Sequence, residues 1–168
     1  MQKIISTICL IMGLFIITAC NQSPYFQSVA KDKLDQKSYA VGYGSASQTY
    51  QDRVDNTYDI DAFIKGVTQF YNGEITQPIK QIRANTLNKM LDHNIYAYYN
   101  GILFASDLKQ NFYHLNAQCW TLTDTQSMIQ GIYEAMNDLK NNNVKHNDYI
   151  SKGYDEILHL CVKKMENK

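Results

Sequence analysis

Apolar residues recur every three or four positions through most of the chain after residue 33, and this spacing limits the fold more than any other feature. Such spacing places apolar side chains along one stripe of an α-helix. No segment shows the sustained alternation of apolar and polar residues that is typical of a half-buried strand. The pattern therefore predicts an all-α fold, a bundle of about five helices.

Capping residues and helix breakers place the ends of these helices. Asp32 or Asp35 is expected to cap the first helix, Asp59 the second and Asn147 the last. The predicted helices cover about 34–51, 60–71, 78–112, 124–140 and 148–161, and the third is expected to bend or break at 92–94. Their apolar stripes are expected to bury, among others, Tyr39, Tyr43, Tyr50, Phe63, Ile82, Leu87, Ile102, Met128, Ile132, Tyr154 and Cys161.

The first 19 residues have the pattern of a secretory signal peptide. Lys3 is their one charge, and an apolar run follows from Ile4 to Ala19. These 16 residues are fewer than the ~20 that a membrane-spanning helix needs. The ending Ile17-Thr18-Ala19-Cys20 resembles a bacterial lipobox, which implies that Cys20 is lipidated and becomes the first residue. The alternative is a plain signal peptide in which Cys20 is incidental.

The residues after Cys20 indicate where the protein resides. Asn21, in place of Asp, resembles the residue at this position in outer-membrane lipoproteins. We therefore expect a protein of the bacterial cell envelope, held by its lipid alone at the outer membrane and facing the periplasm. Residues 20–33 show no apolar period and are predicted to form a tether, followed by a single helical domain over 34–168.

The charge of the mature chain excludes one class of partner. Removal of residues 1–19 from the 168-residue chain leaves 149 residues, with 15 Lys and Arg against 16 Asp and Glu. Neither a basic stripe nor a block of like charges is present. The sequence therefore carries no electrostatic footprint for nucleic acid.

Two cysteines remain for structural use once Cys9 and Cys20 are set aside. Cys119 and Cys161 would lie in an oxidising compartment, where a pair of cysteines is typical of a disulfide. Such a bond would stabilise the fold by about 4 kcal/mol in the chain-entropy model. Two buried free thiols are the alternative.

A short aromatic–glycine pattern occurs in both halves of the chain. Tyr39 to Gly42 precedes Phe63 to Gly66, and Tyr98 to Gly101 precedes Met128 to Gly131. Glycine inside a helix costs about 1 kcal/mol relative to alanine, so four at matched places indicate close helix crossings. We interpret the pattern as two duplicated helical hairpins that pack against each other. Chance is the alternative, since the pattern is short and the chain has 13 tyrosines.

The first of these halves resembles a known dimerisation domain. Residues 34–43 and 58–66, within about 33–75, are similar to the N-terminal domain of Mip-type FKBP peptidyl-prolyl isomerases. In that family the helices intertwine two protomers, which implies a homodimer or a chaperone-like module. No sequence after Gly73 matches the catalytic domain, so isomerase activity is not implied.

The second half resembles the Rap/Tai immunity proteins of type VI secretion, over about 95–163. The similar features are the aromatic–glycine helix, Cys119, the Leu122-Thr123 start of the next helix and the closing Cys161. Proteins of that family are small and helical, and they neutralise peptidoglycan amidase toxins in the periplasm. The resemblance implies a protein partner, such as a secreted or envelope peptidoglycan hydrolase.

Motifs for catalysis, metal binding or cofactor binding are not found, so no catalytic residue, metal ligand or cofactor is predicted. The segment from Asn111 to Thr123 is expected to be the longest irregular stretch and a partner-binding surface. Tyrosine and tryptophan are enriched where proteins bind one another. The predicted partner-binding residues are Tyr99, Tyr113, His114 and Trp120.

These features favour a non-catalytic, lipid-anchored envelope protein that binds another protein as an immunity or inhibitor protein does. The alternative is a homodimerising or chaperone-like module without an isomerase domain.

Overall fold

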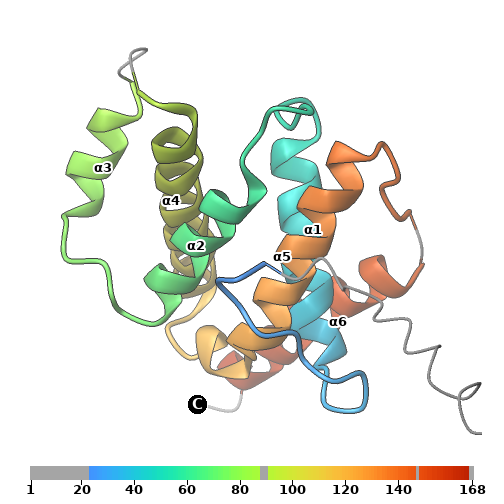
Figure 1. The fold of residues 1–168 in the computed structure, drawn as a ribbon. Coiled ribbons are helices and arrows are strands. Elements are labelled where there is room, and N and C mark those ends of the chain that lie inside the picture. The colour runs from blue at the N-terminus through green and yellow to red at the C-terminus, as the bar shows by residue number, and fades with distance from the viewer. Residues whose placement is uncertain (1–22, 88–90, 147, 167–168) are drawn as a thin grey trace, which may run out of the picture.

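The computed structural model describes residues 23–87, 91–146 and 148–166, and every regular element in this part of the chain is helical. Figure 1 shows α1 (Gln36–Tyr50), α2 (Ile60–Tyr71), α3 (Ile79–Asn85), α4 (His93–Leu115), the 3-10 helix η1 (Cys119–Leu122), α5 (Thr125–Lys140) and α6 (Asp148–Glu166). The all-α prediction is confirmed. The long third helix is broken into α3 and α4, which gives six α-helices in place of about five.

Aspartate side chains begin most of these helices. Asp35, and not Asp32, caps α1 by accepting a hydrogen bond from the backbone N–H of Ser38. Asp59, Asp92 and Asp124 do the same for α2, α4 and α5. The expected cap of the last helix, Asn147, lies outside the described residues.

Helices α1 and α5 cross at two glycines. A Cβ atom on Gly42 would overlap the backbone carbonyl of Met128, and one on Gly131 would overlap the carbonyl of Tyr39. In both cases the carbonyl belongs to the residue three positions before the glycine of the opposite helix. The two backbones therefore touch in a reciprocal arrangement that only glycine permits.

The same crossing occurs between α2 and α4. A Cβ atom on Gly66 would overlap the carbonyl of Tyr98, and one on Gly101 would overlap the carbonyl of Phe63. The close helix crossings expected from the glycines are confirmed. The expected hairpins of consecutive helices are wrong, because the extensive packing joins α1 to α5 and α2 to α4. In Figure 1, α5 lies in front of α1 and α2 in front of α4.

Two serines add a second reciprocal relationship between α1 and α5. The backbone N–H of Asp35 donates to the Ser127 hydroxyl at 2.9 Å, and that of Asp124 donates to the Ser38 hydroxyl at 2.8 Å. Each cap is thus bonded to the first turn of the other helix. Both serines are fully buried, so these hydrogen bonds satisfy backbone groups that water cannot reach.

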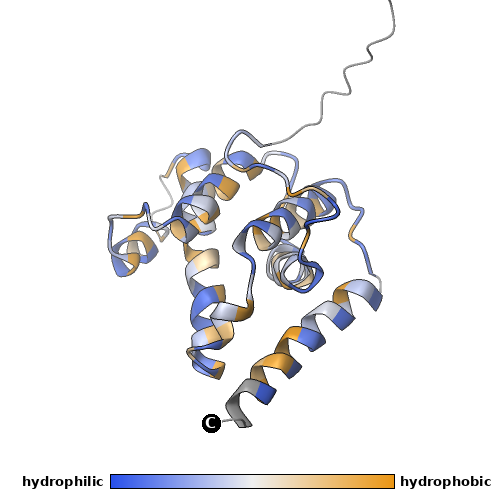
Figure 2. Cartoon of the chain, turned by 90° about the horizontal axis from the view of Figure 1, so that it is seen from below, coloured by the Kyte–Doolittle hydropathy of each residue, from blue (hydrophilic) through white to orange (hydrophobic). Residues whose placement is uncertain are grey.

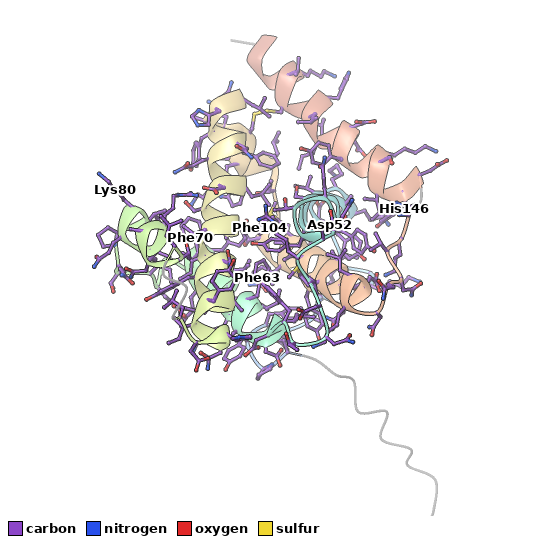
Figure 3. The ribbon with its side chains drawn as sticks, turned by 90° about the horizontal axis from the view of Figure 1, so that it is seen from above. Asp52, Phe63, Phe70, Lys80, Phe104 and His146 are labelled. Carbon is purple, nitrogen blue, oxygen red and sulfur yellow. A yellow bond between two sulfur atoms is a disulfide. The ribbon has the colours of Figure 1, made fainter. Side chains whose placement is uncertain are left out.

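Aromatic rings fill the space between the two crossing pairs. Figure 3 shows Phe63 and Phe104 close together in the middle of the molecule, with Lys80 and His146 at opposite edges. The ring centroids of Phe63 and Phe104 are 5.8 Å apart, and that of Tyr50 lies 5.0 Å from Phe63. This aromatic cluster joins helices from both pairs into one core.

Helix α6 lies against α1 and is bonded to η1. The predicted disulfide between Cys119 and Cys161 is confirmed, which excludes the alternative of two free thiols. Gly153 allows α6 to approach Ala40 of α1 closely. Figure 2 shows apolar and polar residues along α6, as expected of a helix that buries one face. Tyr154 was expected in the core but is 39% exposed.

The described part of the predicted tether lies along the body. The Phe26 ring packs on Tyr133 of α5 at 4.8 Å between centroids, and the Val29 N–H donates to the Gln130 side chain at 2.8 Å. Lys65 of α2 lies over the Tyr25 ring. The predicted signal peptide and Cys20 lie outside the described residues.

Candidate functional site

Most of the segment predicted to be an irregular binding loop is helical. Helix α4 continues to Leu115, and η1 spans Cys119–Leu122. The turn between them is closed by Asn116, whose carbonyl and side-chain oxygens accept hydrogen bonds from the backbone N–H groups of Cys119 and Gln118. The expectation of a long loop from Asn111 to Thr123 is therefore wrong, because polar and aromatic side chains are compatible with an exposed helix end.

The four predicted partner-binding residues do not form one surface. Tyr113 is 45% exposed in the last turns of α4, and His114 beside it is also exposed. Tyr99 lies four turns earlier in α4, at the cluster that packs against α3. Trp120 is partly buried, with its ring centroid 5.3 Å from that of Tyr71 and 5.8 Å from that of Phe112.

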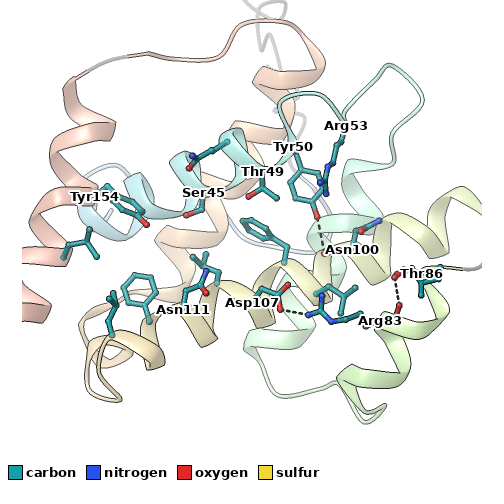
Figure 4. A pocket seen from close by; sticks show the side chains of 18 residues that line it. Ser45, Thr49, Tyr50, Arg53, Arg83, Thr86, Asn100, Asp107, Asn111 and Tyr154 are labelled. Carbon is teal, nitrogen blue, oxygen red and sulfur yellow. Dashed lines mark hydrogen bonds and ion pairs between the residues drawn. The ribbon is translucent and has the colours of Figure 1, made fainter.

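The structure contains a groove that the sequence did not indicate. Its first lobe is a cavity of about 490 Å³ between the last turns of α1, the end of α3, one face of α4, and α6. Figure 4 shows the side chains that line it, among them Ser45, Tyr50, Arg83, Asp107, Asn111 and Tyr154.

A second lobe continues the groove toward the start of α4. This cavity of about 640 Å³ is lined by the loop between α1 and α2, with Tyr58 and Asp59, and by His93 and Tyr96 of α4. The residues shared by both lobes are Tyr50, Arg53, Thr86, Leu87 and Asn100. We refer to the two lobes together as the binding groove.

Large apolar side chains are exposed along the binding groove. Leu87 is 81% exposed, Leu115 is 49% exposed and Tyr96 is 43% exposed. Leu87 was expected in the core, but α3 ends at Asn85, so the helical spacing no longer applies to it. Together with Tyr154, these side chains place exposed apolar surface in both lobes. Apolar surface gathered in one hollow is typical of a binding site.

Amide and hydroxyl side chains surround this apolar surface. Gln48 and Thr49 of α1 face the groove from one wall, and Asn100 and Asn111 of α4 from another. The backbone carbonyl of Asn100 also accepts a hydrogen bond from the Tyr50 hydroxyl, at 3.5 Å. These groups can donate and accept hydrogen bonds, including those to the backbone of a bound polypeptide.

One ion pair crosses the first lobe. The guanidinium of Arg83 donates to the carboxylate of Asp107 at 2.6 Å, which joins α3 to α4 (Figure 4). Both side chains are about half exposed, so the pair contributes little to stability. It nevertheless joins α3 to α4, and Leu87 follows two residues after the end of α3.

The hydroxyl group of Tyr58, beside the second lobe, has no hydrogen-bond partner in the described part of the chain. Its oxygen is buried, and burial raises the pKa of the Tyr58 phenol well above its usual value of 10.0. A buried hydroxyl without a partner costs about 1–3 kcal/mol. Tyr58 is therefore held by ring packing and not by its hydroxyl.

A second polar cluster lies away from the groove, where the chain leaves α5 for α6. Tyr39 donates to Glu134 at 2.6 Å and Tyr43 donates to Asp138 at 2.9 Å. Lys145 forms ion pairs with both carboxylates, at 3.1 and 3.4 Å. These bonds tie the connection before α6 to α1 and α5, and so help to hold the α6 wall of the groove.

Among the described residues, no helix is long and apolar enough to cross a membrane, and no three His, Cys, Asp or Glu side chains are grouped so that they could hold a metal ion.

The fold is that of a small, disulfide-bonded helical domain with an open groove on its surface. The chain belongs to the family described as uncharacterised lipoprotein, whose model matches residues 32–163. It is 41% identical over 136 residues to an uncharacterized protein of Haemophilus influenzae, which is 80% of this chain and 76% of that protein. No solved structure matched the chain.

Family membership identifies a lipid-anchored protein of the cell envelope. The matched family is neither the Rap/Tai immunity family nor the Mip-type dimerisation domain, so the comparisons support neither resemblance.

Proposed function

We propose that this lipoprotein is non-catalytic and binds another protein in its binding groove. The observation that carries the proposal is the combination of exposed Leu87, Leu115 and Tyr96 with amide groups in two adjoining cavities that share five lining residues. Protein interfaces combine aromatic and aliphatic anchors with a polar rim in this way. The groove therefore replaces the four residues that the sequence predicted as the proposed binding surface. Tyr113 and His114 lie beside the groove, and Tyr99 and Trp120 pack against other side chains of the domain.

The finer form of the proposal is an immunity or inhibitor protein that blocks an envelope peptidoglycan hydrolase. It rests only on the sequence features of residues 95–163 that are similar to the Rap/Tai family, and on the expected location at the outer membrane, facing the periplasm. In this role the anchor is the lipid on Cys20, and the disulfide between Cys119 and Cys161 keeps the α6 wall in place.

A test uses the full-length lipoprotein in its native envelope, with copurification of hydrolases and their activity on peptidoglycan as readouts. We expect Leu87→Asp and Leu115→Asp to abolish copurification and release the hydrolase activity. Ile95→Asp is the matched control, because Ile95 is also 43% exposed in α4 but does not line the groove. Copurification that survives both groove substitutions would overturn the binding proposal, whereas a bound partner that is no hydrolase would overturn only the inhibitor role.

The homodimer suggested by the Mip resemblance receives less support. A dimerisation module of this kind needs free helix faces, but the four glycine faces of α1, α2, α4 and α5 are occupied within one chain. We therefore expect a monomer by light scattering in detergent, after the mass of the micelle is subtracted. A dimer that persists on dilution would restore the alternative.

A further inference from the structure

Arg53 has a distinct position in the binding groove. It lies just after α1, where the two lobes meet, and it is exposed. Its guanidinium is 6.0 Å from the centroid of the Tyr50 ring and forms no ion pair with another described residue. In Figure 4 the side chain lies beside Tyr50, on the same side of the pocket as Asn100. Within the described part of the chain, Arg53 is thus a cation that lies over the Tyr50 ring and is not paired with a carboxylate.

The acidic groups near Arg53 already have partners. In the first lobe, Asp107 is paired with Arg83, which leaves Arg53 as the excess charge there. In the second lobe, Asp55 accepts from the N–H and hydroxyl of Thr57, and Asp59 caps α2. Asp55 and Asp59 keep their negative charges in the second lobe, so only the first lobe, with two arginines and one aspartate, has a positive balance. A complementary ligand brings a negative charge to Arg53 and apolar surface to the walls beside it.

From this arrangement we infer that the groove binds a polypeptide segment in which an Asp or Glu lies next to a large apolar residue. The carboxylate pairs with the fork of Arg53, and the apolar side chain enters the first lobe between Phe104 of α4 and Tyr154 of α6. The inference rests on the proposed function and names the chemistry of its partner. Arginine suits this role because its planar guanidinium binds a carboxylate through two parallel hydrogen bonds.

The amides of the groove favour an extended segment over a compact ligand. Asn100 and Asn111 lie eleven residues apart on α4, or about 16 Å along the helix. A segment of about five extended residues covers that distance and presents backbone N–H and C=O groups to both amides. A glycan strand is another ligand with many hydroxyl groups, but the small apolar groups of its sugars do not fill the first lobe between Phe104 and Tyr154.

The test is selection of random twelve-residue displayed peptides on the full-length lipoprotein in detergent, followed by anisotropy measurements on the enriched peptides. We expect enriched sequences to carry Asp or Glu within two positions of Leu, Phe, Tyr or Met. Arg53→Gln should weaken their binding at least about tenfold, and Arg53→Lys should weaken it less. Replacing the peptide's acid by its amide should cause the same loss, with no further loss on Arg53→Gln.

Lys80→Gln is the control, because it removes an exposed cation of α3 that lines neither lobe. Enriched peptides without an acid, or binding insensitive to Arg53→Gln, would overturn this inference. If such peptides still lost affinity on Leu87→Asp, the proposed function would stand without it. Failure to enrich any peptide, or displacement of the peptides by soluble glycan strands, would overturn this inference, and the copurification test alone would then decide the proposed function.

Discussion

The backbone carbonyl oxygen of Tyr39 occupies the position that a Cβ atom on Gly131 would need. Gly131→Ala therefore forces α1 and α5 apart at the centre of the molecule, and neither backbone can move without disturbing the core. We expect a loss of at least about 3 kcal/mol in the free energy of unfolding, measured by urea denaturation.

Gly44→Ala is the matched control for this substitution. A Cβ on Gly44, also within α1, would lie 3.5 Å from Ile150, an ordinary contact. Alanine is favoured over glycine in a helix by about 1 kcal/mol, so this variant should be slightly more stable. Equal stabilities of the two alanine variants would contradict the crossing geometry.

Two tyrosines should respond oppositely to loss of the hydroxyl group. Tyr58→Phe removes a buried hydroxyl without a partner and keeps the ring packing on Tyr50 and Phe63, so we expect a gain of about 1 kcal/mol. Tyr39→Phe removes the donor to Glu134 and should cost about 1–2 kcal/mol. Thermal unfolding of both variants beside the wild type checks the signs, and a destabilised Tyr58→Phe would show that its hydroxyl has a partner after all.

The carboxylate of Glu134 should make stability depend on acidic pH. Burial by itself would raise the pKa of Glu134, but hydrogen bonds from Tyr39, Gln130 and Lys145, and the charge of Lys145, outweigh it and hold the pKa below 4.5. Because the folded pKa lies below the unfolded one, this contribution is complete above the unfolded pKa and is lost as the pH falls through the folded pKa.

We therefore expect the unfolding free energy of the wild type to fall below about pH 4.5 and that of Glu134→Gln to fall less. Part of the fall should remain in the variant, since hydrogen bonds also lower the pKa values of Asp35 and Asp55. Urea denaturation between about pH 3 and 7 gives the comparison. Parallel pH profiles of the two proteins would exclude a role for Glu134.

Loss of the disulfide should weaken the fold and loosen α6. Cys119 and Cys161 are separated by 42 residues, so replacing both by serine should cost about 2–4 kcal/mol. The cysteines carry the link between α6 and η1, so hydrogen exchange should speed up most in α6. Uniform acceleration over all helices would instead indicate a loss of global stability alone.

Much of the fold could be predicted from local pattern, whereas the pairing of helices could not. Apolar spacing and aspartate caps are local signals, and they identified α1, α2 and α5 closely. The same aromatic–glycine pattern occurs on all four helices, so it does not predict which helix packs against which. The residue just before each copy of the pattern distinguishes the two pairs of helices. It is serine in α1 and α5, which pack on each other, and these two serines form hydrogen bonds between the helices. It is alanine in α2 and α4, which also pack on each other.

The groove could not be predicted because it joins residues that are distant in the sequence. Arg53, Asn100 and Tyr154 meet only after both crossings have formed. Spacing placed Leu87 in the core, but α3 stops two residues earlier and leaves it in the groove. Trp120 was predicted to bind a partner because it lies among polar residues. In the structure η1 packs against α4, and the Trp120 ring lies 5.8 Å from that of Phe112.

The described N-terminal segment and the groove lie on different sides of the domain. Ser23 is buried, and the chain from there runs along α5 and α2, whereas the groove is lined by α1, α3, α4 and α6 (Figure 1). The lipid that we propose on Cys20 would join the chain three residues before Ser23. An anchor at this point would hold the α2/α5 side nearer the membrane than the groove, and the groove would stay accessible to an approaching protein.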